Sequence, residues 1–414
     1  MANCKNPKAV LQTFSRILSG ILEISPLSIN HTFKTQSNPI VLSSSEILIL
    51  GACVRPCVAI AAAAGYQATA IDLFNDVDTQ AASNASIKAD DYPEDLFDHA
   101  ESSKANYWLY TGCLENYPEQ IAQLAAKKTL LGNDQDVIHK CRSPEFISEL
   151  AIDANWYYPD AAIARGSLTN NELQCWISKP RLSAAGQGVQ IWRTKPPATA
   201  ERLVQKYIPG PTLGAACISN GIETRVLGIT RHLRMTRRLG VTRFQYCGSV
   251  GPLRVADSLS MAISTMASEI AHGCGIVGLF GLDFKVRNNQ IWLLEINPRF
   301  TASMDLLSKG TGANLIQQHI DACRNKPLIP IQDSKKHSAI ETRAILFAKS
   351  PTRFTPICNQ WDFIADIPDH NATLEVGNPI CSVYGRGNTA SESVRHTMQN
   401  VERLESTLRI ENFE

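Results

Sequence analysis

The chain has 414 residues, of which 44% are hydrophobic and 19% are charged, so it has enough apolar material for two or three domains. Its formal net charge of +1 gives no electrostatic reason to expect nucleic acid or an acidic membrane as the main partner. No apolar run reaches the roughly 18 residues that a membrane-spanning helix needs, so no membrane span is expected.

The cysteine and histidine patterns argue against a structural metal site. The twelve cysteines are scattered without a CxxC pair, which favours reduced thiols and a cytoplasmic location. The nine histidines are also dispersed, and a lone one such as His232 is expected to be structural. Residues 1–45 have three basic residues before the first acid, Glu23, but no clear cleavage site, so we interpret them as a variable extension.

Residues 46–135 have the pattern of a small doubly wound parallel sheet. A strand at 46–52 runs into a glycine, an alanine-rich helix follows at 55–66, and a second strand covers 68–74. Strand, helix and strand in this order predict a right-handed parallel unit. A strand at 106–112 and the helix after it extend this sheet.

The first turn of this sheet, "GACVRP", is a weak match to a dinucleotide-binding fingerprint. It supplies one glycine where three are needed, and Asp72 near the end of the next strand is not specific by itself. NAD is therefore not a favoured cofactor.

From residue 136 onward the pattern changes to shorter strands and loops. A helix is expected at 144–156, and antiparallel strands are expected around a Gly/Ala loop within 173–192 and around a Pro-Gly-Pro turn within 201–220. The helix expected at 258–275 has one apolar face, formed by Leu259, Ile263, Met266 and Ile270.

The segment 279–298 reads as a β-hairpin that carries three oxygen-bearing side chains. Glu295 and Asn297 lie two positions apart on one strand, so they share a face, and Asp283 can point to that face from the neighbouring strand. Carboxylate and amide oxygens on one face suit Mg²⁺, which binds proteins through one or two carboxylates and keeps substrate phosphates as further ligands. The alternative is a polar hairpin edge with a capped turn.

Two other segments have features of a nucleotide site. In "ISKPRLSAAGQGV" (177–189), Lys179 ends an apolar strand and faces a loop with Gly186 and Gly188, an arrangement that can hold a triphosphate although it is not a P-loop. In "LVQKYIPGPT" (203–212), a strand before a turn can offer backbone groups to an adenine edge. The alternatives are an exposed hairpin lysine and an ordinary strand-turn-strand.

In the order in which they occur, these features resemble the ATP-grasp superfamily. Its most specific part here is "EINPR", with an aspartate twelve residues earlier, and the resemblance extends over nearly all of the chain after residue 45. It implies that Asp283, Glu295 and Asn297 hold magnesium or manganese ions. It also implies that Arg299 contacts the transferred phosphoryl group or a substrate carboxylate.

The same resemblance implies the residues that bind ATP. Lys179 and the loop with Gly186 and Gly188 would bind its phosphates, and the backbone of Lys206 and Ile208 would contact adenine. The first basic residue of the family is best matched by Arg142, with Lys140 as the alternative. The chain departs from the family in having Ala185 before Gly186, and in having Leu213 and Gly214 where an acid usually binds the ribose.

The fold that this resemblance implies is α/β in class (α+β in its second part). After the extension, 46–135 would be the small parallel domain that precedes the ATP-grasp domain. The ATP-grasp domain, 136–330, would have two subdomains whose antiparallel sheets sandwich ATP. Residues 331–414 would be a β/α segment packed on that core.

The implied reaction joins a carboxylate to an amine through an acyl phosphate, with small-molecule substrates and no nucleic-acid or membrane partner. The alternatives are a carboxylase-like or small-acid kinase-like enzyme and a non-catalytic nucleotide-binding module. The oligomeric state stays open, with a homodimer as one option. Arg55 and Glu115-Asn116 are candidates for the substrate side, because ligands favour the carboxyl ends of parallel strands.

A finer resemblance rests on "GACVRPCVAIAAAAGYQATAIDLF", "LYTGCLEN", "FQYCGSVGP" and "NPRFTASMDLL". These segments are similar to an ATP-grasp branch associated with one-carbon metabolism that uses tetrahydromethanopterin and methanofuran, which includes enzymes like tyramine–glutamate ligase. The implied substrates are an amino acid, such as glutamate, and a small amine.

Overall fold

The computed structural model describes residues 46–159, 175–234, 236–311, 314–329, 339–354, 361–370 and 372–408. The extension expected at 1–45 lies outside these ranges. Within them, no helix is both long enough and apolar enough to cross a membrane.

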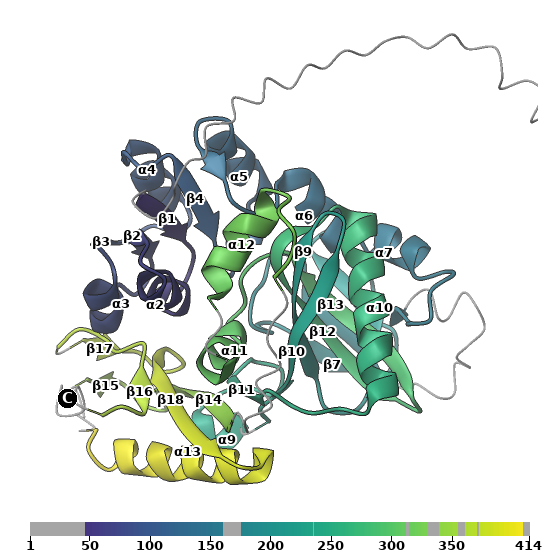
Figure 1. Cartoon of the computed structure of the whole chain (residues 1–414). Coiled ribbons are helices and arrows are strands. Elements are labelled where there is room, and N and C mark those ends of the chain that lie inside the picture. The colour runs from purple at the N-terminus through teal and green to yellow at the C-terminus, as the bar shows by residue number, and fades with distance from the viewer. Residues whose placement is uncertain are drawn as a thin grey trace, which may run out of the picture. The chain divides into compact units, whose positions relative to one another are not determined.

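The first part of the described chain is a five-stranded parallel sheet in the order β3-β2-β1-β4-β5 (Figure 1). Its strands are β1 (Glu46–Leu50), β2 (Gln67–Asp72), β3 (Ala85–Lys88), β4 (Tyr107–Tyr110) and β5 (Thr129–Leu130). The predicted parallel unit is confirmed.

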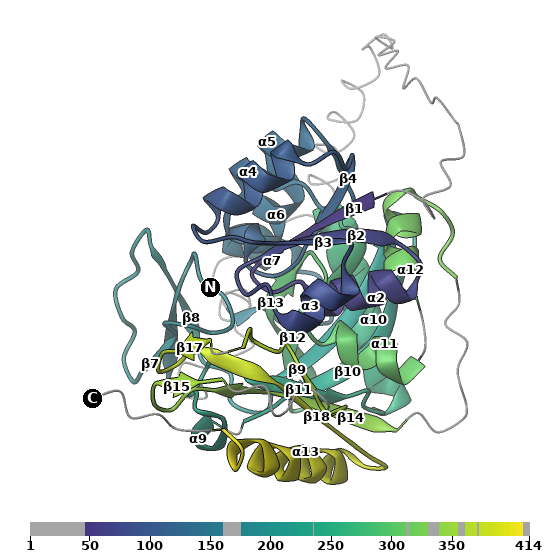
Figure 2. The ribbon, with the colours of Figure 1, turned by 90° about the vertical axis from the view of Figure 1, so that its left-hand side faces the viewer.

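Helices cover both faces of this sheet (Figure 2). This cover buries both faces of β1, which is apolar at every position after Glu46. Ile47 and Ile49 pack with α2 (Arg55–Ala63) on one face. Leu48 and Leu50 pack on the other face in the core that also holds buried residues of α4 and α5. The helices that follow are α3 (Val77–Ala82), α4 (Glu94–Ser102), α5 (Pro118–Ala125), α6 (Gln135–Arg142) and α7 (Pro144–Leu150), with a short 3₁₀ turn, η2, at Leu114–Asn116.

The sequence pattern predicts no element between residues 75 and 105, where the structure has α3, β3 and α4. The reason is local. No residue of the edge strand β3 is buried, and the buried set of α3 is limited to Thr79, so neither element has an apolar periodicity to read.

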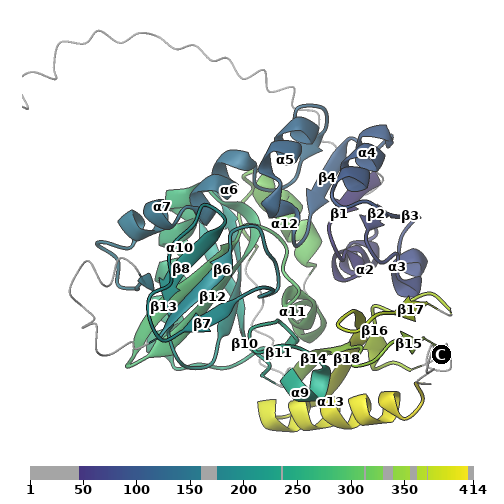
Figure 3. The same ribbon diagram turned by 180° about the vertical axis from the view of Figure 1, so that it is seen from behind.

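A three-stranded antiparallel sheet, β7-β6-β8, follows. It consists of β6 (Trp176–Pro180), β7 (Gln190–Trp192) and β8 (Arg202–Lys206), and in the view from behind it lies over β12 and β13 (Figure 3). The sequence analysis treats β8 and the next strand, β9 (Leu213–Asn220), as a strand-turn-strand. That expectation is wrong about pairing, because the two strands lie in different sheets on either side of Pro209-Gly210-Pro211.

The largest sheet has eight strands in the order β13-β12-β9-β10-β11-β14-β18-β16. Its members besides β9 are β10 (Thr224–His232), β11 (Gly248–Gly251), β12 (Val277–Arg287), β13 (Gln290–Asn297), β14 (Ile340–Phe347), β16 (Ile364–Ala365) and β18 (Pro379–Gly387). The remaining elements are the small ladder of β15 (Thr352–Arg353) and β17 (Thr373–Leu374) and the helices α9 (Thr236–Leu239), α10 (Asp257–Cys274), α11 (Met304–Thr311), α12 (Leu315–Cys323) and α13 (Ala390–Glu405).

Strand β9 is covered on both faces, which explains its small side chains. Ala216 and Ile218 belong to the core that contains α12, whereas Ala215 and Cys217 belong to the core that contains α10. The apolar face predicted for α10 is confirmed, since Ile263, Met266 and Ile270 are fully buried and Leu259 is partly so. At the other end of the sheet, α13 packs on β14 and β18.

Candidate active site

The β12–β13 hairpin brings the predicted metal ligands to one place. Asp283 pairs directly with Glu295, and Gly281 pairs with Asn297. On the far side of Asp283, Phe284 pairs with Leu293, so Leu294 is an extra residue that forms a β-bulge beside the carboxylates. The ladder therefore fixes both acids side by side.

The surroundings of these acids differ. Glu295 is exposed to the cavity, yet partial desolvation raises its pKa, and the charge of Lys179 opposes this rise. Asp283 lies near His232, with Oδ1 at 3.3 Å from Nε2. Its other oxygen accepts a hydrogen bond of 3.4 Å from the side-chain amide of Asn297. Two carboxylates beside a cationic lysine fit a divalent ion that also binds phosphate.

Lys179, at the end of β6, reaches across to the hairpin. Its Nζ donates to the Leu294 carbonyl at 3.4 Å, so the three-stranded sheet contacts the bulge of β13. The loop after Lys179 docks on the segment 241–246, because Tyr246 N donates to Ala185 O at 2.8 Å. Gly186 has a left-handed φ of +75°, and a Cβ there would lie 2.0 Å from Phe244 O, so this position requires glycine.

In the segment 206–208, which is expected to contact adenine, two backbone groups already form hydrogen bonds within the protein. The carbonyl of Ile208 accepts a hydrogen bond of 2.6 Å from Lys285 Nζ, and burial lowers the pKa of Lys285 to about 8. Tyr207 N donates to Cys175 O at 2.9 Å. Lys206 is buried, and its Nζ lies 4.1 Å from the centre of the Trp176 ring. A carbonyl oxygen has two lone pairs, so Ile208 O can accept a second hydrogen bond from an adenine amino group while it stays bonded to Lys285.

Arg299 is tied to the parallel sheet by Glu115 of η2. Its Nη2 donates to a Glu115 carboxylate oxygen at 2.5 Å and to Asn297 Oδ1 at 3.0 Å. Burial alone would raise the pKa of Glu115, but the charge of Arg299 holds it below its ordinary value. A Cβ at Gly112 would lie 3.4 Å from Arg299 Cζ, so the turn after β4 packs against the guanidinium.

A cavity of about 1040 Å³ joins these parts. Of the predicted residues, its lining includes Lys179, Gly186, Lys206, Ile208, Asp283, Glu295, Asn297 and Arg299. Arg142 and Gly188 are not among the lining residues. Arg142, at the end of α6, donates to the carbonyl of Arg181, and Gly188 has a φ of +69° beside Pro180.

Other lining residues were missed or placed elsewhere by sequence reasoning. His232 was taken as structural, yet the β9–β10–β12 arrangement sets it against Asp283. Arg343 and Asp366 line the cavity from the C-terminal strands, and no motif marks them. Arg55, a candidate for the substrate side, is not among the residues that line the cavity. It is 4% exposed and belongs to a buried ion network with Asp366.

Residues 151–303 match the model of a family described as "ATP-grasp domain". Among curated proteins, it is 25% identical over 189 residues to the uncharacterized protein MJ0776 of Methanocaldococcus jannaschii. It is also 26% identical over 114 residues to the carbamoyl phosphate synthase large chain of Campylobacter jejuni. The matched regions cover 46% and 27% of this chain but only 43% and 10% of these relatives' lengths.

Solved structures confirm the expected fold class. The biotin carboxylase domain of Hydrogenobacter thermophilus 2-oxoglutarate carboxylase, a dimer in complex with MgADP, ADP and bicarbonate, superimposes with a TM-score of 0.66 at 14% identity, covering 89% of this chain and 90% of that one. The ADP complex of N5-carboxyaminoimidazole ribonucleotide synthetase gives 0.63 at 15% identity, covering 88% and 97%. ADP and magnesium are thus ligands of structures with this fold.

Proposed function

We propose that this chain is an ATP- and magnesium-dependent ligase that activates a carboxylate as an acyl phosphate and joins it to an amine. The main support is the pairing of Asp283 with Glu295, opposite Lys179, on the wall of one large cavity. A transfer of this kind depends on positioning and charge neutralisation, so a site with carboxylates, Lys179 and Arg299 but without an activated nucleophile is sufficient.

Each residue has a role in this proposal. Asp283 and Glu295, with Asn297 beside them, hold magnesium, which neutralises phosphate charge when bound. Lys179 and the loop around Gly186 bind the triphosphate. Arg299, fixed by its ion pair to the parallel sheet, orients the substrate carboxylate.

The reaction balances in two steps. A carboxylate oxygen attacks the γ-phosphorus while the bond to the ADP oxygen breaks, which gives an acyl phosphate and ADP. The amine nitrogen then attacks the acyl carbon, the carbon–oxygen bond to phosphate breaks, and the nitrogen loses a proton. The products are an amide, ADP and inorganic phosphate.

The finer parts of the proposal concern substrates and context. The acid is an amino acid such as glutamate, the amine is small, and the product belongs to the biosynthesis of a one-carbon carrier cofactor, supported by the one-carbon-branch segments quoted above. The proposed domain limits stay at 46–135, 136–330 and 331–414. A cytoplasmic location is proposed because the ten cysteines in the described ranges are free thiols, and a homodimer is proposed as the assembly.

The test is a screen of acid–amine pairs for ADP and phosphate release by the full chain. The expected result is a pair that supports release only when acid, amine, ATP and magnesium are all present. Asp283→Asn should abolish this release. Unchanged release by Asp283→Asn would overturn the metal assignment, and release that needs an acid but no amine would indicate a kinase.

A carboxylase-like reaction is the second candidate, favoured by the similarity to biotin carboxylase domains, one of which was solved with bicarbonate. Bicarbonate would then take the place of the acid. ATP cleavage that depends on bicarbonate in the same screen would decide for this reaction. Binding of MgATP without any cleavage would indicate a non-catalytic module.

A further inference from the structure

A second polar cluster lies on the wall of the cavity, at the carboxyl ends of β1 and β2. It consists of Cys53 in the turn after β1, Asp76 just before α3, and Asp366 just after β16. The sulfur and one oxygen from each carboxylate all lie within 4.8 Å of one another. All three residues line the cavity. Ligands favour this edge of a parallel sheet.

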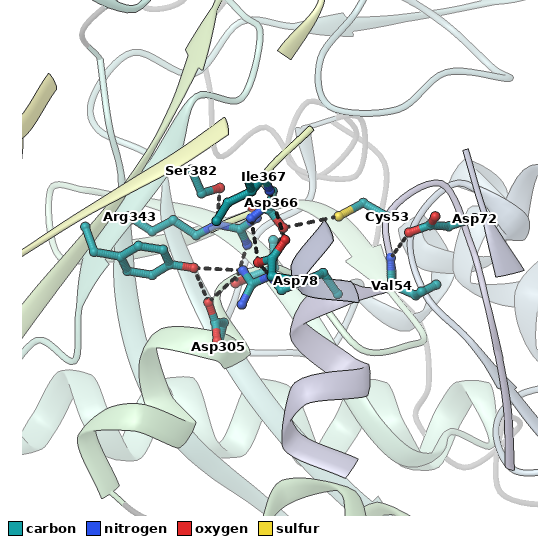
Figure 4. Close-up of polar contacts among 12 residues, drawn as sticks. Cys53, Val54, Asp72, Asp78, Asp305, Arg343, Asp366, Ile367 and Ser382 are labelled. Atoms are coloured by element: carbon teal, nitrogen blue, oxygen red, sulfur yellow. Dashed lines mark hydrogen bonds and ion pairs between the residues drawn. The ribbon is translucent and has the colours of Figure 1, made fainter. Parts of the chain in front are cut away.

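Asp366 is already neutralised. Arg55 Nε donates to Oδ1 at 2.9 Å and Arg343 Nη2 donates to Oδ2 at 2.7 Å, while the Cys53 thiol contacts Oδ1 at 3.7 Å (Figure 4). The left-handed φ of +55° at Asp366 is held by Asp78, which accepts from the backbone N–H groups of Asp366 and Ile367.

The neighbouring acids are satisfied as well. Asp72 accepts hydrogen bonds from the backbone of Val54, Phe74 and Asn75. Asp305 accepts from Arg55 and from the hydroxyl of Tyr384. These acids have structural partners, so none of them is available to a ligand without a loss of internal contacts.

Asp76 is the exception. It is 5% exposed, it precedes α3 without capping it, and its carboxylate has no hydrogen bond or ion pair with any other part of the chain that the structure describes. Burial raises its pKa to about 8, the charges of Asp366, Asp72 and Asp78 add to this rise, and the charge of Arg55 opposes it. Because Asp76 lines the cavity, a cation bound there would favour the ionised form of its carboxyl group.

The cluster lies close to the proposed site of chemistry. Thr111 Oγ1 donates to Cys53 O at 3.2 Å, and Ala52 N donates to Gly112 O at 3.2 Å. Since Gly112 packs against the Arg299 guanidinium, one short segment, 111–112, separates the cluster from Arg299.

We propose that Asp76, with Asp366 and Cys53 beside it, binds a positively charged ammonium group of the acceptor substrate, a group that does not itself react. An ammonium that stays paired with a carboxylate keeps its proton and cannot attack an acyl phosphate, so a different nitrogen of the same molecule must react. The acceptor class is therefore an amine with a second basic nitrogen, such as a diamine or a basic amino acid.

An organic ammonium fits better than a divalent metal ion. Both oxygens of Asp366 are occupied by guanidinium groups, and a doubly charged ion would be repelled by Arg55 and Arg343. The Cys53 thiol has a pKa well above its ordinary value because of burial, so it is not a thiolate ligand.

The inference rests on the proposed ligase function, but binding can be tested separately from turnover. The probes are putrescine, cadaverine and lysine methyl ester, with butylamine as the monoamine comparison, titrated calorimetrically into the full chain with MgADP. At least one diamine should bind more tightly than butylamine, and Asp76→Asn should weaken it by about 10-fold or more. The matched control is Asp369→Asn. Asp369 is a more exposed acid of the cavity lining that accepts a hydrogen bond from Gln80, so this variant should bind the diamine like wild type.

Further measurements separate a structural role from a binding role. The melting temperature of Asp76→Asn should equal or exceed that of wild type, because within the described part of the chain the carboxyl group has no hydrogen-bond partner to lose. With a diamine substrate, KM for the amine should rise while KM for ATP stays unchanged. If the diamine still binds in an Asp76-dependent way but no pair supports ATP cleavage, the ligase proposal fails and the binding site stands.

Two outcomes would overturn the inference. One is that no diamine binds more tightly than butylamine. The other is equal diamine binding by Asp76→Asn and wild type; if this variant also loses binding of Mn²⁺ or Zn²⁺ at the cluster, the cluster is a metal site.

Discussion

Glu295 owes its position to backbone pairing rather than to a side-chain partner of its own. The ladder sets it opposite Asp283, and the bulge at Leu294 directs it into the cavity. A carboxylate held in this way keeps its ligand geometry when the cavity is empty, which is the preorganisation that a metal-phosphate site needs.

Glu295→Gln should lower magnesium-dependent ATP cleavage on the order of 100-fold or more, because an amide replaces one of two anionic ligands. Steady-state ADP release, measured over a magnesium titration, tests this. Glu223→Gln, which alters a half-buried acid paired with Arg225 and not among the cavity-lining residues, should behave as wild type. Equal activity of both variants would remove Glu295 from the metal site.

The Glu115–Arg299 pair joins the parallel sheet to the end of β13, and both side chains are largely buried. Glu115→Gln leaves the guanidinium without its carboxylate, so the free energy of unfolding should fall by about 3 kcal/mol. Urea denaturation measures this change. Restoring apolar packing in Glu115→Gln/Arg299→Met should recover part of it.

The exposed pair of Lys127 with Glu101 offers the comparison. Glu101→Gln should change the free energy of unfolding by less than about 1 kcal/mol, because water screens that pair. A similar small effect for Glu115→Gln would show that Arg299 finds another partner.

At this scale, the sequence could predict that Asp283, Glu295 and Lys179 come together, because their spacing places them on strand ends that face one another. Their roles in binding metal and phosphate stay predictions. It could not predict His232 or Arg343, since each reaches the cavity through the lateral order of strands in the eight-stranded sheet. Arg142 was predicted from its place before α7. Its guanidinium donates to the carbonyl of Arg181, and its charge opposes the rise in the pKa of Glu295, so its role in binding ATP stays a prediction.

Among the elements, the loop between β6 and β7 is held tightly against the segment 241–246. Gly186→Ala would place a Cβ 2.0 Å from Phe244 O, so the loop must leave the segment 241–246. We expect KM for ATP to rise about 10-fold, because the loop would no longer be ordered over the phosphates, and this rise is measurable by steady-state kinetics.

Gly65→Ala is the control for this substitution. Its φ of +83° imposes a similar conformational cost of about 1 kcal/mol, but no atom lies within 4 Å of the added Cβ. Its KM for ATP should stay unchanged. Equal KM values for the two variants would show that docking of the glycine loop does not contribute to ATP binding.

Across the whole molecule, His319 of α12 connects the two larger sheets. Its Nδ1 accepts from Leu279 N of β12 at 2.8 Å, and its Nε2 lies 2.9 Å from Leu131 O beside β5, so the neutral tautomer carries its proton on Nε2. Burial lowers the pKa of His319 to about 4. The imidazole of His319 therefore takes up a second ring proton at a higher pH in the unfolded chain than in the folded chain.

The sign follows from that difference. Neutral His319 makes its full contribution to the free energy of unfolding above the ordinary histidine pKa of about 6.5. That contribution falls by up to about 3 kcal/mol as the pH is lowered towards 4. Urea denaturation from pH 7 to pH 4 should show the stability advantage of wild type over His319→Gln shrinking by this amount. The exposed control His272→Gln should show no such trend. A stability difference between wild type and His319→Gln that stays constant from pH 7 to pH 4 would contradict the prediction.

How far the fold could be predicted depended on local signal. The units with strong periodicity, such as β1 to β2 and α10, were read directly from the sequence. The division of β8 and β9 between two sheets was not, because a Pro-Gly-Pro turn predicts a change of direction but not which strand pairs with which. The short edge strand β3 has no buried face and gave no pattern at all.

The ion pair between Arg55 and Asp366 joins residues 311 positions apart in the chain. During synthesis, Arg55 emerges from the ribosome long before Asp366, Arg343 or Tyr384 exists. Of its ion pairs, the one with Asp78 is the only one described that the first part of the chain can supply. The cavity is completed only when the C-terminal strands have been translated, which ties the maturation of the proposed active site to the last part of the polypeptide.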